Sequence, residues 1–469
     1  MTGPEDDASG ARAPGPPATG AEPSAAPLLR TDVPGPRSLE LWARDAAHHA
    51  GNSSPAAQWL RLVLRDGRGA VVRDVDGNQF VDLSSGAVVA NLGHAPAAVT
   101  QAVAHESQRL MHFFDFATPP RAEFFERLAR TLPPELQTFQ MYSTGAEAVE
   151  AVIRLVRAHT GRYEVLSFHQ AWHGRTLGAM SLMGGFPLKR GYGPFAPGML
   201  HSVNANCYRC PLGLERDRCA VACAGMVDRV YEQSGEQRLA AVVVEPVQGV
   251  GGVIPFPPEF LAHLRRFCDR TGALLVFDEI LTGVGRTGTM WAFEQTGVVP
   301  DVLIAGKGLA CGYPISVIAS RREILDSGPF AMPGAGASTF ASGNVACAAA
   351  AAALGMLEDG AIVANGRRVG AAMLSALRDV ADRHPLVGDV RGVGMLMALE
   401  LVTDRATKAP IPPATARRLV TALARRGVLV AGGGAVLRIT PPLVIEEEMA
   451  LAAVALLDEA LSEVEASAA

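Results

Sequence analysis

Charge is scarce in this chain, and no long run of one sign is present. Charged residues make up 19% of the 469 residues, and the formal net charge is −5 at pH 7. Because a long basic run is missing, nucleic acid is not expected as the main partner. Hydrophobic residues reach 49%, and a chain of this length can bury a large core in two or three domains.

Long apolar runs are missing as well. The longest uncharged stretch, around Phe330–Leu357, is broken by Pro, Gly and Ser and is otherwise mostly alanine, so it is too weakly apolar to span a bilayer. No basic segment followed by an apolar one opens the chain, so no secretory signal is expected. We therefore expect no membrane partner and a cytoplasmic location, where thiols stay reduced.

Large apolar residues are also nearly absent from the start of the chain, which is rich in Pro, Ala and Gly. Such a segment cannot bury enough surface to offset its ordering entropy, so residues 1–36 are expected to be a disordered tail. Order is expected from about Ser38. The alternating pattern of Val71–Leu83 around Asp76-Gly77 then predicts a β-hairpin.

From about residue 137, apolar strand candidates alternate with helical patterns. The strand candidates are Thr138–Tyr142, Val165–Phe168, Ala240–Val244, Ala273–Phe277, Val302–Ala305 and Ile315–Ala319. Continuous apolar strands separated by helices predict an α/β fold with a mostly parallel sheet buried on both faces. Ligands of such sheets bind beyond the carboxyl ends of the strands.

The last hundred or so residues predict a smaller α+β unit. Its expected elements are helices at Arg367–His384 and Ala414–Arg426, strands near Gly394–Leu401 and Val436–Thr440, and a closing helix. The predicted organisation is a tail at 1–36, an N-terminal segment of a small domain at 37–95, a large cofactor-binding domain at 96–350, and the C-terminal part of the small domain at 351–469.

Two apolar strands end on charged residues that suit one kind of chemistry. Val276-Phe277 leads into Asp278, and Val302–Ala305 leads towards Lys307. A partly desolvated lysine beside a fixed carboxylate suits pyridoxal 5'-phosphate: the lysine forms a Schiff base, and the aspartate keeps the pyridine nitrogen protonated. Two such residues are a weak signal alone, and the surrounding motifs strengthen it.

Two further motifs follow strands. Ser143-Thr144-Gly145-Ala146 opens a helix, so its free amides and the helix dipole form a phosphate seat, or the motif is a plain helix cap. Trp172 either stacks on a flat ring or packs beneath a loop. Four more stretches each read singly as ordinary connections: Val244–Gly249, Asp278–Gly288, Gly336–Asn344 and Val436–Leu443.

In order and spacing, these stretches resemble the class III aminotransferases, a branch of the fold-type-I pyridoxal-phosphate enzymes, from about Trp42 to Leu461. The resemblance implies a large, mostly parallel sheet domain with a smaller α+β domain. It implies these cofactor contacts: Lys307 and Asp278 as above, Gly145 and Ala146 at the phosphate, Trp172 and Ile280 on the two ring faces, and Thr339 at the phosphate from a partner subunit. A homodimer is thus expected.

The substrates are implied in the same way. Arg438 would bind a substrate carboxylate with its bidentate fork, or else it is a surface arginine beside a Pro-Pro turn. Two departures from the family pattern stand out. Leu281 replaces a glutamine that bonds the cofactor's phenolic oxygen, and Val250 replaces a glutamate that pairs with the arginine in ornithine- and 4-aminobutyrate-type members. An ω-amine donor with a 2-oxo acid acceptor is therefore expected.

Other reactions use the same scaffold. Racemases, epimerases and a decarboxylating relative share these motifs, and fold-level likeness does not separate them from aminotransferases. A binding or structural protein on an inactive scaffold is a further alternative. The retention of both Lys307 and Asp278 argues against it.

Four of the seven cysteines are grouped in one segment. Cys207, Cys210, Cys219 and Cys223 have a spacing that suits a tetrahedral thiolate site for zinc, although the gap and the second pair depart from the usual ribbon. The alternative is a reduced, partly buried cysteine loop. Cys268, Cys311 and Cys347 are expected to be small core residues.

Overall fold

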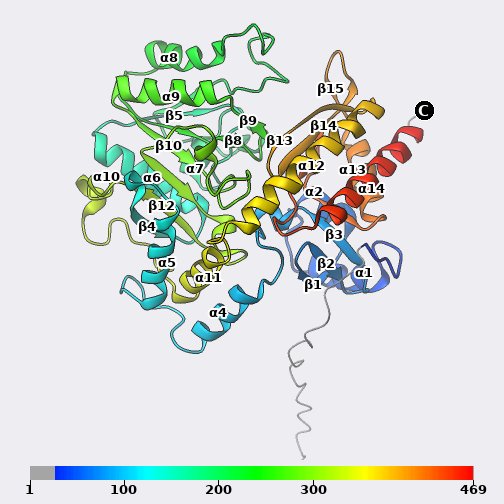
Figure 1. The fold of residues 1–469 in the computed structure, drawn as a ribbon. Helices are drawn as coiled ribbons and strands as arrows, with labels where there is room; N and C mark the ends of the chain where they lie inside the picture. Colours follow the sequence, from blue (N-terminus) through cyan, green and yellow to red (C-terminus); the bar gives the residue numbers. More distant parts are fainter. Residues whose placement is uncertain (1–26, 468–469) are drawn as a thin grey trace, which may run out of the picture.

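The computed structural model describes residues 27–467, which form two parts (Figure 1). One part holds a seven-stranded sheet, and the other joins the N-terminal segment to the C-terminal helices. The predicted tail overlaps the described chain at residues 27–36, and its remainder lies outside it. In the overlap, the N–H of Leu28 donates to the carbonyl of Gln79 at 3.1 Å, and the N–H of Arg30 donates to Oδ1 of Asn78 at 2.7 Å.

The seven-stranded sheet confirms the predicted α/β class. Its order is β4 (Thr138–Tyr142), β12 (Ser316–Ser320), β11 (Val302–Ala305), β10 (Leu274–Asp278), β7 (Leu239–Val244), β5 (Glu164–Phe168) and β6 (Met199–Ser202). Strand β12 is antiparallel to both neighbours, and the other pairs are parallel. All six strand candidates are present, whereas β6 was missed because its short, half-buried segment is not continuously apolar.

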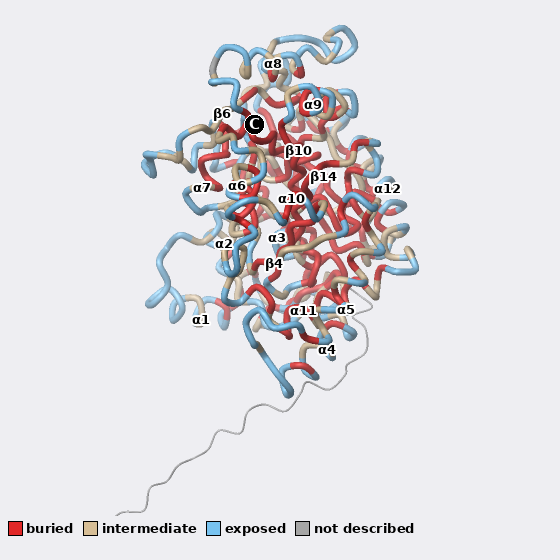
Figure 2. The backbone as a smooth tube through the Cα atoms, turned by 90° about the vertical axis from the view of Figure 1, so that its left-hand side faces the viewer, coloured by how far each residue is buried: buried red, intermediate tan, exposed pale blue. Residues whose placement is uncertain are grey.

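Both faces of this sheet are buried, which explains its continuous apolar strands. In β10, Leu275 and Phe277 join the core under α9 (Pro258–Thr271), while Val276 joins the core under α6 (Gly145–Thr160). Successive side chains of a strand point to opposite faces, so every position needs an apolar residue when helices cover both. Figure 2 shows this buried interior running through the molecule.

The smaller part contains two four-stranded sheets. One joins β1 (Leu64–Arg68), β2 (Val71–Asp74), β3 (Gln79–Leu83) and β16 (Val428–Val430); the other joins β13 (Val387–Val393), β14 (Leu396–Asp404), β15 (Ala409–Pro410) and β17 (Val436–Ile439). The β2–β3 pairing, with Val72 opposite Phe80, confirms the predicted hairpin. Helices α12 (Ala361–Arg383), α13 (Pro413–Ala424) and α14 (Glu447–Ala466) cover the sheets.

One core is shared by both ends of the chain in this smaller part. Phe80 and Leu83 are buried in the same cluster as Leu419, Val428 and Leu457. This shared core agrees with a small domain built from both ends, and the domain boundaries themselves stay a prediction.

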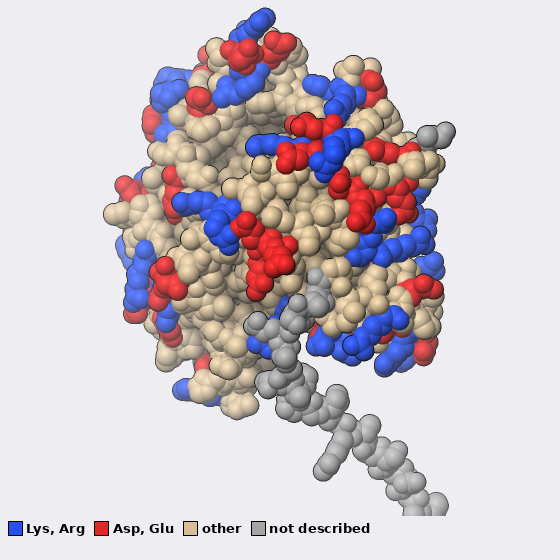
Figure 3. Space-filling model, turned by 45° about the vertical axis from the view of Figure 1, so that its right-hand side comes forward, with Lys and Arg blue, Asp and Glu red and all other residues tan. Residues whose placement is uncertain are grey.

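The remaining elements connect these layers. They are α1 (Pro36–Ala46), α2 (Pro55–Leu60), α3 (Ser85–Val88), α4 (Ala97–Ser107), α5 (Pro119–Arg130), α7 (Leu177–Ser181), α8 (Ala222–Ser234), α10 (Arg322–Leu325), α11 (Asn344–Gly355), β8 (Val247–Gln248) and β9 (Ile254–Pro255). Within residues 27–467, no helix is long and apolar enough to cross a membrane. Figure 3 shows acidic and basic side chains interspersed over one face of the molecule.

Candidate active site

The carboxyl ends of four strands carry the residues of the candidate site. Strands β11, β10, β7 and β5 are consecutive in the sheet, and all four run parallel to one another. Lys307 follows β11, Asp278 ends β10, Glu245 follows β7, and the Trp172-His173 pair follows β5. The topology therefore gathers the predicted lysine and aspartate at one edge of the sheet, with two residues that were not predicted.

Lys307 differs from the two other lysines of the chain. The Nζ atom of Lys408 donates to the carbonyl of Tyr208 at 2.6 Å, and that of Lys189 lies 4.5 Å from the ring centre of Phe195. No such partner is found for Lys307 within the described residues. Its φ of 45° is in the left-handed region, where strained backbone often marks a functional position.

Burial lowers the pKa of Lys307, which favours the neutral amine. The carboxyls of Asp278 and Glu245 act in the opposite direction, and the positive charge of Arg438 lowers this pKa further. The amine therefore loses its proton more readily than an exposed lysine does. A neutral amine can act as a nucleophile or accept a proton, which is the state that the predicted chemistry requires.

Asp278 is held by a buried histidine. Nδ1 of His173 lies 2.8 Å from Oδ2 of Asp278, and the N–H of Ile280 donates to Oδ1 at 3.1 Å. Burial disfavours charge on His173, but the hydrogen bond to Asp278 and the charges of Asp278 and Glu245 outweigh it and raise the His173 pKa. A fixed, histidine-bound carboxylate fits the partner that a protonated pyridine nitrogen needs.

The start of helix α6 fits a phosphate group. Oγ1 of Thr144 accepts the N–H of Glu147 at 3.2 Å, and the first amides of the helix, at Gly145 and Ala146, have no acceptor within the helix. A Cβ on Gly145 would lie 2.7 Å from Cδ1 of Ile280. A Cβ on Gly306 would lie 3.5 Å from Cγ2 of the same isoleucine, so Ile280 lies between this helix start and the turn of Lys307.

Trp172 is half-buried beside the same strand ends. The backbone N–H of Trp172 donates to Oε1 of Glu245 at 2.8 Å, and the guanidinium of Arg175 lies 4.8 Å from the centre of the indole ring. The ring of Phe186 meets it edge-on at 5.2 Å. The backbone of Trp172 is thus fixed at the site, and the stacking of its ring on a cofactor stays a prediction.

Thr339 is exposed, in the loop that precedes α11. The hydroxyl of the preceding Ser338 donates to the carboxylate of Glu147, which also accepts the N–H of Ser143 at 2.9 Å. The loop therefore lies near the proposed phosphate seat of its own chain. Whether Thr339 reaches a partner's phosphate stays a prediction.

Arg438 projects from β17 without a carboxylate partner. No ion pair or side-chain hydrogen bond of this arginine is found between residues 27 and 467, and burial is the cause that lowers its pKa. By contrast, Arg391 on β13, at the opposite side of β14, is paired with Glu400 at 2.6 Å and with Asp389 at 2.7 Å. Of these two arginines, Arg391 is paired with carboxylates, whereas the guanidinium of Arg438 is free among the described residues.

The two departures from the family pattern lie in one apolar wall. Leu281 is buried in a cluster with Val88, Val247, Val253, Leu396 and Ala398, and Val250, Val393 and Val436 pack against it. A Cβ on Gly249 would lie 2.5 Å from Cδ1 of Leu281, so the loop that carries Val250 is in close contact with Leu281. Val436 is two residues before Arg438 on β17, which brings this wall near the arginine.

Glu245 and His173 were not predicted as site residues, although both occur in stretches that were singled out. The available signal was their position at strand ends, since the ends of neighbouring parallel strands meet at one edge. The order β10–β7–β5 could not be read from the sequence. Arg391 was missed for a different reason: its Nε donates to the backbone carbonyls of Gly252 and Val253, which carry no signal of residue type.

The structure does not support the predicted zinc site. In the part of the chain that is described, no group of three or more His, Cys, Asp or Glu side chains is arranged to hold a metal ion. The thiol of Cys207 donates to the carbonyl of Ala205 and that of Cys219 to the carbonyl of Arg216, so these thiols bond to the backbone. Burial, together with the neighbouring thiols, raises the pKa of Cys223 to about 11, so this thiol keeps its proton.

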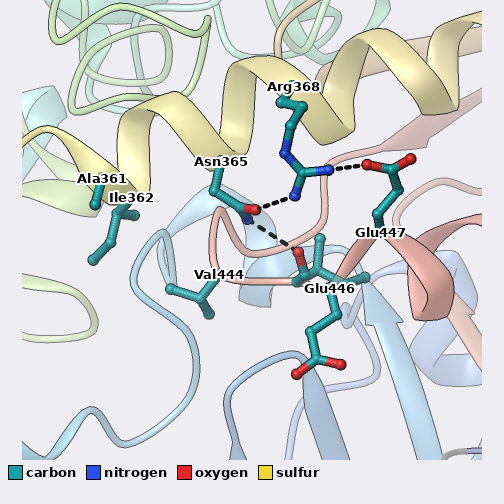
Figure 4. A pocket seen from close by; sticks show the side chains of 8 residues that line it. Ala361, Ile362, Asn365, Arg368, Val444, Glu446 and Glu447 are labelled. Carbon is teal, nitrogen blue, oxygen red and sulfur yellow. Dashed lines mark hydrogen bonds and ion pairs between the residues drawn. The ribbon is translucent and has the colours of Figure 1, made fainter.

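A surface hollow of about 360 Å³ lies elsewhere, between α12 and the segment before α14 (Figure 4). Three of its polar side chains have partners: Arg368 pairs with Glu447 and donates to Asn365 at 2.9 Å, and Asn365 donates to the carbonyl of Ile445 at 3.1 Å. None of the predicted site residues lines it, so it is separate from the candidate active site.

A family model described as aminotransferase class-III matches residues 53–461. The chain belongs to the class III aminotransferases. It is an enzyme of a family that uses pyridoxal phosphate to move an amino group from an amino donor to a 2-oxo acid. The predicted family, fold class and cofactor are therefore confirmed.

Relatives of this aminotransferase have several activities. It is 33% identical to an isoleucine 2-epimerase of Lentilactobacillus buchneri, over 88% of this chain and 92% of the relative. It is 34% identical to a 4-aminobutyrate aminotransferase of Mycobacterium leprae, over 90% and 95% of the two chains.

Solved structures of similar proteins are transaminases. An (S)-enantioselective omega-transaminase from Thermomicrobium roseum has a TM-score of 0.85 and 32% identity, covering 91% of this aminotransferase and 98% of that chain. An amine transaminase from an uncultivated Pseudomonas species, in its PLP-bound form, has a TM-score of 0.83 and 31% identity, with coverages of 88% and 98%.

Proposed function

We propose that this aminotransferase takes the amino group of a terminal, non-α amine and passes it to a 2-oxo acid. The observation that supports this proposal most directly is the unpaired guanidinium of Arg438, which lies beside an apolar wall with Val250 and Leu281. A 2-oxo acid offers a carboxylate for Arg438, and an amine offers an apolar chain for the wall. The two substrates would thus use different surfaces of one site.

The cofactor roles are part of the proposal. Pyridoxal phosphate supplies an aldehyde that binds amines and a ring that accepts an electron pair. Lys307 would hold the cofactor covalently and, once displaced by the donor, its Nζ would move the proton from the donor carbon. Asp278, backed by His173, would keep the proton on the ring nitrogen. Gly145 and Ala146 would donate their amides to the phosphate.

Charge explains why ornithine and 4-aminobutyrate are expected to be poor donors. In a 2-oxo acid, the carboxylate is bonded to the reacting carbon, whereas in 4-aminobutyrate it lies several carbons away. A guanidinium placed to bind the carboxylate of a 2-oxo acid is therefore not placed to bind the carboxylate of 4-aminobutyrate. A distal charged group would then lose its hydration against Val250 and Leu281, which offer no partner. Val250 also provides no carboxylate to neutralise Arg438.

We also propose that the enzyme acts as a homodimer. Large apolar side chains are exposed near the Thr339 loop, including Phe113, Phe116 and Phe340, which are 56%, 67% and 71% exposed. The ring of Phe340 lies 5.5 Å from that of His112, so this loop and the segment around residue 112 lie together. Apolar exposure of this extent is typical of an interface, and a partner here would meet the exposed Thr339. A cytoplasmic location is proposed as well, because thiols stay reduced there and the seven cysteines of this chain are free.

Epimerisation is the second candidate, because a relative of 33% identity is an isoleucine 2-epimerase. It needs the same proton transfer at the donor carbon but no acceptor. Acceptor dependence therefore separates the two reactions.

A matched donor pair tests the proposal. 1-Aminobutane and 4-aminobutyrate differ only in the distal carboxylate, and each is assayed with pyruvate and with 2-oxoglutarate, alongside ornithine. We expect kcat/KM for 1-aminobutane to exceed that for the other two by at least about tenfold, which corresponds to about 1.4 kcal/mol. A highest value for ornithine or 4-aminobutyrate would refute the donor proposal. Epimerisation of isoleucine at its α-carbon without an acceptor, together with no amino transfer, would favour the epimerase.

A further inference from the structure

We propose that Glu245 is a positioning residue, which fixes the backbone of Trp172 and the substrate-side loop Gly249–Val253 relative to each other. This inference rests on the proposed function, since it concerns the arrangement of that site. Glu245 directly follows strand β7 and is 4% exposed. Its Oε1 accepts the N–H of Trp172 at 2.8 Å, and its Oε2 accepts the N–H of Gly249 at 3.1 Å.

The two hydrogen bonds link different functions. Trp172 is the residue proposed to stack on the cofactor, whereas Gly249 starts the loop that carries Val250. One carboxylate thus connects the cofactor side of the site with the substrate side. A displacement of Glu245 would move both.

The other end of the loop is held from the smaller part of the molecule. Nε of Arg391 donates to the carbonyls of Gly252 at 2.9 Å and Val253 at 3.0 Å. Between the two ends, a Cβ on Gly251 would lie 2.3 Å from the carbonyl oxygen of Gln170, so the loop runs directly against the segment before Trp172. The loop is therefore fixed at its start by Glu245 and at its end by Arg391.

The ionised form of Glu245 is the one that suits this geometry. Both oxygens accept N–H groups, and a protonated carboxyl would direct its own hydrogen at one of them. Burial, assisted by Asp278, raises the pKa of Glu245 to about 7, while His173 and the two backbone N–H groups favour the charge. The ionised form that accepts both N–H groups therefore dominates only above about pH 7, so the two hydrogen bonds are strongest there.

Glu164 provides a matched control on the neighbouring strand β5. It is also 4% exposed, and its two oxygens accept the N–H groups of Glu236 at 2.7 Å and Arg238 at 2.9 Å. It lies at the start of β5, at the opposite end of the sheet from the candidate site. Replacing either glutamate by glutamine removes one of two equivalent backbone acceptors.

The test compares Glu245→Gln with Glu164→Gln. Both variants should show a similar fall in the midpoint of thermal unfolding. Only Glu245→Gln should weaken pyridoxal phosphate binding, measured by quenching of tryptophan fluorescence in the apoenzyme, and raise the donor KM. We expect about a ten- to hundredfold change in each, the scale of one hydrogen bond to a charged group.

Equal cofactor affinity and donor KM in the two variants would overturn the inference. If Glu245→Gln does not fold, Glu245→Asp is judged by the same criterion, because it keeps the charge but is too short to reach both N–H groups. Failure of the unmodified enzyme to bind pyridoxal phosphate would refute the proposed function instead.

Discussion

Replacing Arg438 by methionine should separate the two half-reactions. Methionine keeps an unbranched side chain that packs beside Val436 but removes the guanidinium. Truncating one partner of a buried charge pair costs about 2–5 kcal/mol, and the lower part of this range applies because Arg438 is only half-buried. A loss of about 2–3 kcal/mol lowers kcat/KM for the 2-oxo acid about 30- to 150-fold.

The amine half-reaction should change little, since 1-aminobutane has no carboxylate for Arg438. Rapid-mixing absorbance measures each half-reaction alone, with the amine in one experiment and pyruvate in the other. Arg162→Met is the control, because Nη1 of Arg162 donates to the carbonyls of Leu239 at 3.2 Å and Thr271 at 2.7 Å, away from the site. Equal losses in both half-reactions, or no loss with pyruvate, would refute the role of Arg438.

Three further perturbations address the site and its surroundings. Lys307→Ala should abolish turnover while the protein still folds and binds the cofactor non-covalently; appreciable turnover without added amine would contradict this. Asp278→Asn should lower kcat at least about a hundredfold, and a loss below a few-fold would mean that Asp278 does not face the ring nitrogen. Glu279 is fully buried with a pKa raised to about 7, mainly by burial, from 4.5. A raised folded-state pKa stabilises the fold below the unfolded pKa, and this contribution of about 3 kcal/mol is lost as the pH rises to 7. The urea concentration at the unfolding midpoint of the unmodified enzyme should therefore fall between pH 5 and 7. Glu279→Gln should make this fall smaller, and an equal fall in the variant would contradict the prediction.

The sheet was predictable because burial on both faces leaves a simple pattern. A strand such as Val302–Ala305 must be apolar at every position, and its bounds agree with the prediction. The order of the strands was not predictable, because the insertion of β12 between β4 and β11 depends on long-range packing. The short strand β6 carries His201 and Ser202 and so does not have the continuous apolar pattern.

Residue type, position after a strand and the surrounding motifs together predicted part of the candidate site. Lys307 and Asp278 were predicted because their chemistry is distinctive and each follows an apolar strand. His173 and Glu245 act through contacts, which become visible only when β10, β7 and β5 are known to be neighbours. The cysteine spacing misled for the same reason, since spacing does not fix where the thiols point.

The covalent attachment of the cofactor tests the central claim most directly. The chain has three lysines, Lys189, Lys307 and Lys408, so the attachment site can be assigned without ambiguity. Purified enzyme loaded with pyridoxal phosphate should absorb near about 410–430 nm, and borohydride reduction followed by peptide mass analysis should find one pyridoxyl group per chain, on Lys307. A label on Lys189 or Lys408, or no covalent label at all, would contradict the account.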